Sequence, residues 1–370
     1  MLAEDKHLYK MKRNIKIIIF VIVAILYSVL AVAFSYDVGK YITASINNCL
    51  TVIIPSLYIF MIISGFLIST NLYKAIGRPF DFISRYIFKI PSEFFSIFLI
   101  SSVAGYPVGA KLLTDLKTSN KISDIDAETM IGYCYLGGPA FFCGAVGVTL
   151  FDNIRVGIII FVSIFLSNLV LGIIAGLSRR IPPKCSVKTE YSITFDKLIN
   201  SIISGAKSLF IICAIIVFFS SFICFADKLN VLQTISIWIS NLTKADIQNT
   251  SAAVRTFIEI SQLSGFSHGC YELIPVITAL MSFGGLCIIM QVMCITYKII
   301  RMNYFFICRL FCVFLSYFIS KFLLGLFYYD IIVSAATYLR IGFRHTSPIP
   351  AAFLLIMTIL LLLKNSVEKN

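Results

Sequence analysis

The stretch "SSVAGYPVGAKLLTDLK", residues 101–117, decides how this sequence is interpreted. An apolar segment stops at Gly105-Tyr106-Pro107 and resumes with Gly109. Proline ends helices because it has no backbone N–H, and glycine allows backbone conformations that other residues avoid. Inside a membrane, such a break is tolerated only where it is buried in protein or lines a wet cavity. The alternative is that Gly105 and Gly109 simply let two helices pack closely.

The composition places most of the chain in a lipid bilayer. Of its 370 residues, 59% are hydrophobic and 13% are charged, whereas a soluble domain carries about 25% charged residues. Several apolar runs reach the roughly 20 residues that cross a membrane. We therefore expect an all-α polytopic integral membrane protein whose main surroundings are lipid.

The charged and reactive residues argue against other classes of protein. The formal net charge of +13 fits Lys and Arg in cytoplasmic loops beside anionic headgroups, so we expect no nucleic-acid partner. Eleven cysteines without a C-x-x-C pair are typical of reduced packing residues rather than a metal site. Neither an H-E-x-x-H nor a Walker pattern is present, and we expect no enzyme, no catalytic residue, no metal and no bound cofactor.

Apolar runs and basic loops predict the path of the first half. Residues 14–35 cross from a cytoplasmic N-terminus, 46–70 return, and the basic loop 71–91 is cytoplasmic. Segments 92–103 and 108–119 are too short to cross, because twelve helical residues rise only about 18 Å. They predict a re-entrant hairpin whose tip is the Gly-Tyr-Pro break.

A second interruption follows the hairpin. Residues 125–151 are long enough to cross but contain Gly137-Gly138-Pro139, so we expect two half-helices with an unwound joint. Residues 154–177 then cross back.

The second half is predicted to repeat this plan. Its expected segments are an amphipathic stretch at 193–205, a span at 206–225, an interfacial stretch at 226–250, an entering arm at 251–264, a turn at Gly265-Phe266, segments 269–281 and 282–298 with a break at Gly284-Gly285, and spans at 304–327 and 349–363.

Short motifs relate the two halves. "AGYPVGA" from Ala104 matches "SGFSHGC" from Ser264, and "LGGPAFFCGAV" from Leu136 matches "FGGLCIIMQV" from Phe283. Charge bias opens the two hairpins to opposite sides, which predicts two inverted-topology repeats. Secondary transporters built this way hold solute and ions near the bilayer midplane at discontinuous helices. The predicted division is a stub and first helix at 1–39, a first repeat at 40–177, a cytoplasmic linker at 178–192, a second repeat at 193–327, and an outer loop, last helix and cytoplasmic tail at 328–370.

Glu259, in "TFIEISQLSGF", is the principal candidate for a functional side chain. A carboxylate in a membrane segment is costly unless it is paired or wet, and it marks a functional site by default. The alternative is a salt bridge to Arg255, four residues earlier on the same helix face. Gln262 and Ser264 are its expected neighbours.

Three further polar residues have open interpretations. Gln291 either belongs to the site or bonds a neighbouring helix. His268 is either interfacial or a proton relay. Lys111 meets an anionic group, pairs with Asp115, or extends to the cytoplasmic headgroups, which we favour. The predicted substrate-binding residues are Gly105, Tyr106, Pro107, Gly109, Lys111, Gly138, Pro139, Glu259, Gln262, Ser264, Gly265, Gly284, Gly285 and Gln291.

The motifs "SVAGYPVGAKLLTDL", "GGPAFFCGAVGVTLFDN", "FIEISQLSGF" and "SFGGLCIIMQV" resemble the YlbJ-type sporulation integral membrane protein family, which is grouped with the nucleoside-recognition, or Gate-domain, proteins. The resemblance covers about residues 40–325. It implies a fold similar to that of concentrative nucleoside carriers. It also implies a role in spore-forming bacteria linked to spore cortex formation, in the cell membrane or a forespore membrane, with no settled substrate.

The resemblance rests on particular residues in each motif, and this chain differs from the family in one stretch. The matching positions are Gly105, Tyr106, Pro107, Gly109, Ala110 and Lys111 in the first motif, Pro139, Phe141, Gly144 and Gly147 in the second, Glu259 with Ile260 in the third, and Gly284, Gly285 and Gln291 in the last. Relatives usually carry Asn, Ser or Thr just before the second break, where this chain has Cys134-Tyr135-Leu136-Gly137. The first-half site is therefore less polar than in the family.

Two functions of different classes follow. The first is a transporter-like protein that binds or moves a small polar solute at a midplane site, with H⁺ or Na⁺ as a coupling ion. The second is a non-transporting membrane scaffold for a sporulation or envelope complex, which the less polar first half favours. A homo-oligomer is left open in either case.

Overall fold

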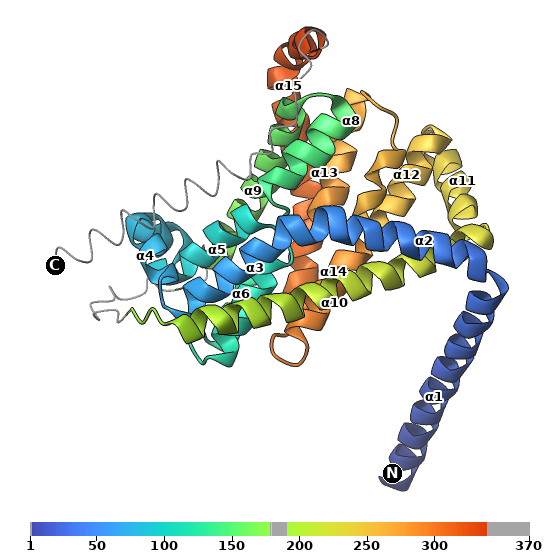
Figure 1. Ribbon diagram of the computed structural model, residues 1–370, viewed down its shortest axis with the longest axis horizontal. Coiled ribbons are helices and arrows are strands. Elements are labelled where there is room, and N and C mark those ends of the chain that lie inside the picture. Colours follow the sequence, from blue (N-terminus) through green and yellow to red (C-terminus); the bar gives the residue numbers. More distant parts are fainter. Residues whose placement is uncertain (1, 178, 180–190, 339–370) are drawn as a thin grey trace. The chain divides into compact units, whose positions relative to one another are not determined.

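The computed structural model describes residues 2–177, 179 and 191–338, and every regular element within them is a helix (Figure 1). Among these residues, six segments are long and apolar enough to cross a membrane: Asn14–Ala33, Ser35–Ser69, Ile154–Leu177, Phe195–Lys228, Tyr271–Thr296 and Asn303–Phe327. The prediction of an all-α polytopic membrane protein is confirmed. The expected span at 349–363 and most of the expected linker at 178–192 lie outside the described residues.

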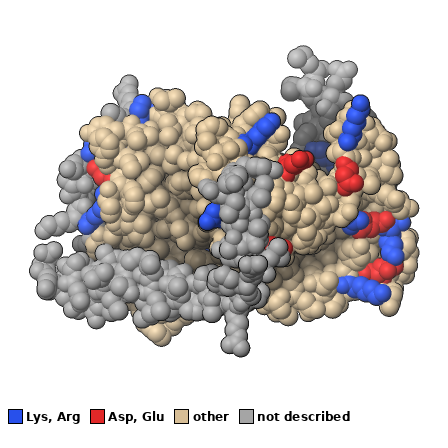
Figure 2. Space-filling model, turned by 90° about the horizontal axis from the view of Figure 1, so that it is seen from above, with Lys and Arg blue, Asp and Glu red and all other residues tan. Residues whose placement is uncertain are grey.

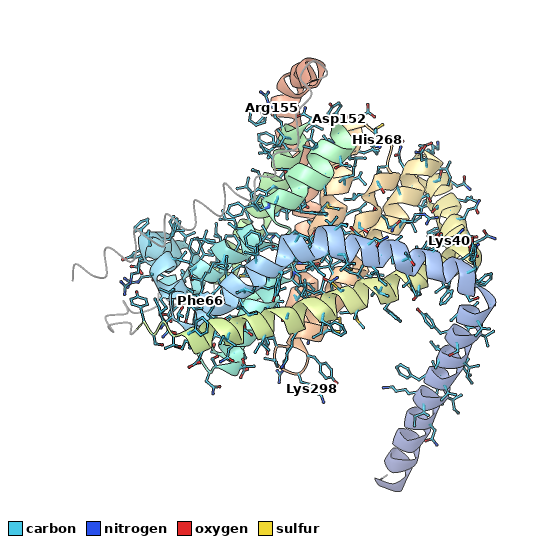
Figure 3. All side chains as sticks on the ribbon, viewed as in Figure 1. Lys40, Phe66, Asp152, Arg155, His268 and Lys298 are labelled. Carbon is cyan, nitrogen blue, oxygen red and sulfur yellow. The ribbon has the colours of Figure 1, made fainter. Side chains whose placement is uncertain are left out.

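Charged residues are sparse between the ends of these spans. Figure 2 shows broad areas of one face without any charged side chain. In Figure 3, Asp152, Arg155 and His268 lie near one another at the top of the view, and Lys298 lies at a loop lower in the view.

Two long antiparallel helical segments pack side by side. Helices α2 (Ser35–Asn48) and α3 (Ile54–Ser69) are joined by a π-helical turn, η1 (Cys49–Ile53), into one continuous rod. Helix α10 (Phe195–Lys228) runs beside this rod (Figure 1). The span expected at 206–225 is present, but it is continuous with most of the stretch expected at 193–205, because no glycine–proline break interrupts α10.

Two contacts fix how the rod and α10 are aligned. Lys228 Nζ lies 2.7 Å from Asp37 Oδ2, and Ser220 Oγ donates to the Tyr41 carbonyl at 2.8 Å. Helix α1 (Leu2–Ala33) precedes the rod, and the Tyr27 ring near its end packs edge-on against Phe225 of α10.

The break that opened the sequence interpretation is present. Helix α5 (Ser92–Ala104) ends there and α6 (Val108–Thr118) begins after it. Gly105 has a φ of +80°, a conformation that residues with side chains rarely adopt. Before α5, the expected loop 71–91 is itself helical, with α4 (Tyr73–Gly77), η2 (Arg78–Phe80) and η3 (Ile83–Phe88).

The second break packs directly against the first. Helix α7 (Asp124–Met130) ends early, and regular helix returns only with η4 (Phe141–Val148), α8 (Thr149–Phe151) and α9 (Ile154–Leu177). A Cβ atom on Gly105 would lie 2.6 Å from the Gly138 nitrogen, and one on Gly109 would lie 2.1 Å from the Cys134 carbonyl oxygen. Close packing at Gly105 and Gly109 is therefore confirmed, and it coexists with the break.

The second half contains α11 (Val231–Thr243), α12 (Ile247–Ile258), η5 (Ile260–Gly265), η6 (Tyr271–Leu273), α13 (Ile274–Phe283), α14 (Gly285–Thr296) and α15 (Asn303–Tyr338). The break at Gly284 is confirmed, with a φ of +89°. The arm expected to run to residue 264 is wrong in its end point. Helix α12 already stops at Ile258, because Glu259 is extended and its side chain caps η5.

Candidate binding site at Glu259

Two cavities meet at Glu259. The first, of about 520 Å³, is lined among others by Lys40, Tyr41, Asn48, Ser220, Glu259 and Gln262. The second, of about 400 Å³, is lined among others by Asn48, Gly105, Tyr106, Gly138, Glu259 and Gln291. Four residues line both: Asn48, Ile216, Glu259 and Ser261.

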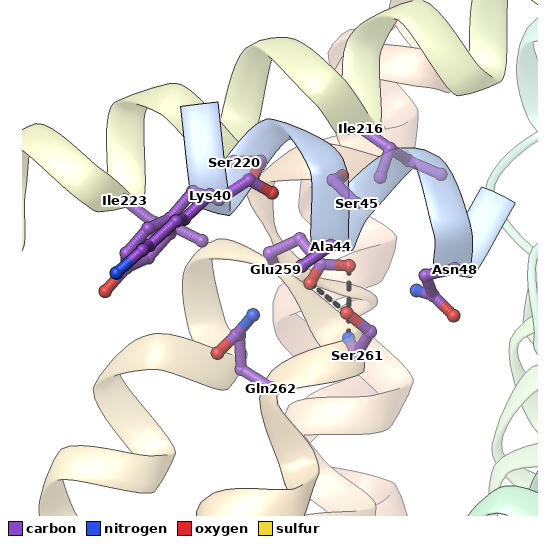
Figure 4. Close-up of a pocket in the computed structure, with 11 residues that line it drawn as sticks. Lys40, Ala44, Ser45, Asn48, Ile216, Ser220, Ile223, Glu259, Ser261 and Gln262 are labelled. Atoms are coloured by element: carbon purple, nitrogen blue, oxygen red, sulfur yellow. Dashed lines mark hydrogen bonds between the residues drawn. The ribbon is translucent and has the colours of Figure 1, made fainter. Parts of the chain in front are cut away.

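The Glu259 side chain is buried at this junction. It is only 7% exposed. The Ser261 N–H donates to Oε1 at 3.1 Å, and the Ser261 hydroxyl donates to Oε2, as Figure 4 shows. Within the described residues, no Lys, Arg or His side chain forms an ion pair with this carboxyl.

The expected alternative, a salt bridge between Glu259 and Arg255, is wrong. Arg255 Nη1 instead donates to Asp227 Oδ2 at 2.6 Å. The same carboxylate oxygen also accepts from the Tyr41 hydroxyl at 2.9 Å. Because Glu259 is extended, its side chain leaves the helix face that Arg255 occupies.

Only some of the predicted substrate-binding residues line the two cavities. Those that line the second cavity are Gly105, Tyr106, Gly138, Glu259, Ser264 and Gln291, together with His268. Gln262 lines the first. Neither lining includes Pro107, Gly109, Lys111, Pro139, Gly265, Gly284 or Gly285.

Lys111 is paired inside the protein. Its side chain is buried, and Nζ donates to Asp115 Oδ2 at 2.6 Å and to Ser204 Oγ of α10 at 3.0 Å. The pairing with Asp115 is confirmed. The extension toward cytoplasmic headgroups is wrong, because the ammonium group is enclosed between helices.

Arg309 of α15 is the functional candidate that sequence reasoning missed. It is fully buried, and its guanidinium donates to the carbonyls of Tyr135, at 3.1 Å, and Ser282, at 3.2 Å. It also donates to the Gly132 carbonyl and, at 2.8 Å, to Asn168 Oδ1 of α9. Glu259 was selected because a charged residue inside a membrane segment marks a functional site by default, and the same principle would also have selected Arg309.

The position of Arg309 explains how two broken helices are satisfied. Gly132 and Tyr135 follow α7, and Ser282 lies in the last turn of α13, so their carbonyls lack helical partners. Helix C-termini carry partial negative charge, which a buried cation offsets. The Arg309 side chain therefore donates hydrogen bonds both to the break after α7 and to the break between α13 and α14.

Arg309 also supports the cavity wall through aromatic rings. Its guanidinium lies 4.7 Å from the Tyr135 ring centroid. Tyr135 stacks on Tyr106, which lines the second cavity, at 5.2 Å. The Tyr135 hydroxyl donates to the Phe283 carbonyl at 3.1 Å.

One sequence pattern that could suggest an enzyme is not supported by its surroundings. Gly265-Phe266-Ser267-His268-Gly269 has the G-x-S-x-G spacing. A nucleophile elbow places its serine between a strand and a helix, whereas Ser267 follows the 3₁₀ turn η5. Its N–H donates to Asn249 Oδ1 at 2.9 Å. Within the described residues there is also no cluster of three His, Cys, Asp or Glu side chains that could hold a metal ion.

The helical spans define a polytopic helical membrane protein, with two adjoining cavities beside a buried carboxyl. Over 122 residues, 33% of this chain, the sequence is 33% identical to "Sporulation integral membrane protein YlbJ" of Bacillus subtilis (strain 168). That match covers 30% of the relative's length. It confirms the resemblance to the YlbJ-type proteins over this stretch. No family model matches the chain, and no solved structure matches it.

Proposed function

We propose that this protein is transporter-like and binds, and moves across the bilayer, a small polar solute at the level of Glu259. The observation that carries the proposal is the buried carboxyl on the wall shared by two cavities, without a charged partner in the described residues. An ionisable group is costly inside a membrane, and its presence there marks a functional site by default.

The broken helices support the same proposal. The backbone at Gly105 and at Gly138 lines the second cavity, and Glu259 itself is the extended residue that ends α12. Discontinuous helices at a central site are the arrangement by which secondary transporters bind solutes and coupling ions. Two inverted repeats, re-entrant hairpins and a carrier fold of the concentrative-nucleoside type are part of this proposal.

The cellular role is proposed from similarity. The relative's name assigns it to sporulation and to the membrane. We infer a role in a bacterial cell membrane or forespore membrane during sporulation. Because the match covers 30% of that relative, its activity and partners come to this chain only as part of the proposal.

A thermal-shift screen tests the proposal. Detergent-purified protein would be heated with nucleosides, bases, amino acids, dipeptides and sugar acids. A ligand at about 100 times its Kd stabilises the folded state by about 2.7 kcal/mol. We expect at least one compound to raise the Tm of the wild type and not that of Glu259→Gln.

Glu272→Gln is the matched control, because Glu272 is exposed and lines neither cavity. It should keep the full shift. A panel in which no compound changes the Tm would favour the scaffold function instead. An equal shift in Glu259→Gln would place the binding site elsewhere.

A further inference from the structure

The two cavities follow one another along the same antiparallel helix pair. On the rod of α2, η1 and α3, the first cavity is lined from Lys40 to Asn48 and the second from Asn48 to Phe60. On α10, the first cavity is lined from Ile223 to Ile216 and the second from Ile216 to Ile212. Because the rod and α10 are antiparallel, rising residue numbers on the rod and falling numbers on α10 both lead from the first cavity to the second.

The junction lies well inside this path. At a rise of about 1.5 Å per residue, Asn48 is about 12 Å along the helix from Lys40 and about 18 Å from Phe60. Together these lengths are about 30 Å, which is the thickness of a hydrocarbon core. The π-helical turn η1 starts at Cys49, immediately beyond Asn48, and such turns are frequent at functional sites.

Glu259 is the acidic side chain shared by the two linings. In the view of Figure 4 its carboxyl faces Ser261 and lies between Asn48 and Gln262. The titratable groups around it are the thiols of Cys49 and Cys287. Along the cavities they are Lys40 and Tyr41 in the first, and Tyr106 and His268 in the second.

Among the described residues that line the first cavity, Lys40 carries the positive charge, and its ammonium group contacts an aromatic ring instead of Glu259. Lys40 Nζ lies 4.3 Å from the centroid of the Tyr36 ring. Arg255 is held by Asp227. An ionised carboxylate buried without a counter-charge is strongly unfavourable, and binding a proton removes that cost.

We propose that Glu259 carries a proton between the two cavities, so that the coupling ion of the proposed transporter is H⁺. This inference rests on the proposed function. The carboxylate takes a proton from hydronium in one cavity, which leaves water and a carboxylic acid. The acid then returns the proton to water in the other cavity. Only O–H bonds form and break.

A capping role for Glu259 accounts for less of this arrangement. The Ser261 N–H donates to Oε1 and the Ser261 hydroxyl to Oε2. A glutamine amide keeps an acceptor oxygen for the N–H, and its NH₂ group can donate to the rotated hydroxyl. Capping does not explain a carboxyl that both cavities reach. Glu259→Gln separates the two roles, because the variant keeps an acceptor for Ser261 and cannot titrate.

Labelling with dicyclohexylcarbodiimide tests the proton. The reagent reacts with protonated carboxyls in apolar surroundings: the acid adds across a C=N bond, and the product rearranges to a stable N-acylurea. Full-length protein in phosphatidylethanolamine–phosphatidylglycerol vesicles would be labelled in potassium or sodium buffer, and peptides mapped by mass spectrometry. We expect an adduct on Glu259 that decreases at alkaline pH and is equal in both buffers.

Two outcomes would overturn the inference. One is protection of Glu259 by sodium, which would indicate a Na⁺ site. The other is absence of the adduct in protein that still shows a Glu259-dependent thermal shift with a solute. In that case the proposed function stands and proton carriage fails. An exposed carboxyl, Glu272, should remain unlabelled and serves as the internal control.

Cysteine accessibility tests whether the cavities open to opposite sides. Ser45→Cys places a thiol in the first cavity and Ser56→Cys places one in the second. A membrane-impermeant maleimide, added from one side of sealed vesicles, should modify one variant and not the other, with the reverse result from the opposite side. Modification of both from the same side would contradict carriage between two sides.

Discussion

At the residue scale, Arg309 shows how a bundle tolerates unwound backbone inside a membrane. Its guanidinium contacts the carbonyls of Gly132, Tyr135 and Ser282. Each of these acceptors would otherwise be buried without a partner, because the helix that should bond it has ended. The fork of donors on arginine suits several carbonyls at once, and a lysine ammonium cannot reach them all.

We predict that Arg309→Lys and Arg309→Leu both destabilise the protein strongly. Leaving several buried polar groups unpaired should cost about 3 kcal/mol or more of unfolding free energy. The measurement is the Tm in detergent by intrinsic fluorescence. Arg301→Leu is the control, because Arg301 is exposed and lies 3.8 Å from Glu128, and it should leave the Tm nearly unchanged. A stable Arg309→Leu would show that the breaks are satisfied otherwise.

At the element scale, the two breaks of the first half depend on each other. The segment after α7 lies against the turn between α5 and α6, with no room for a Cβ at Gly109. The glycines therefore do more than end helices. They let one interrupted backbone approach another and so form a wall of the second cavity.

Gly109→Ala is expected to destabilise the protein by about 1–3 kcal/mol, because the added methyl group meets the Cys134 carbonyl at 2.1 Å. Gly144→Ala is the matched control, since nothing lies within 4 Å of its Cβ position. Its Tm should stay the same or rise, as glycine disfavours helix. Equal Tm values for the two variants would contradict the observed packing.

At the scale of the whole molecule, Asp227 ties three helices together. Its carboxylate on α10 accepts from Tyr41 of α2 and Arg255 of α12. The Asp37–Lys228 pair joins α2 to α10 nearby, but both of its side chains are about one-third exposed (32% and 38%). Asp227 is less exposed (15%), so its loss should matter more.

Asp227→Asn is therefore predicted to lower the Tm clearly, whereas Asp37→Asn should cost less than about 1 kcal/mol of unfolding free energy. Scanning fluorimetry of both variants in the same detergent checks the order. The reverse order would mean that the exposed pair, rather than the Asp227 network, holds this end of the helix pair.

The sequence by itself determined the membrane class, the span Ile154–Leu177 and the breaks at Gly105 and Gly284. These signals are local, because hydropathy over a helix length and a glycine or proline act within one segment. It also selected Glu259, since an acid in an apolar stretch stands out. Whether Glu259 carries a solute or a proton stays a prediction.

Only the tertiary structure decided which partners these residues have. It paired Arg255 with Asp227 instead of Glu259, enclosed Lys111 with Asp115, and brought Arg309 to Gly132, 177 positions away. Helical periodicity reports which residues share a face, but not which face of a distant helix will cover them. The junction of the two cavities arises from such long-range packing, where one side chain's burial depends on several helices at once.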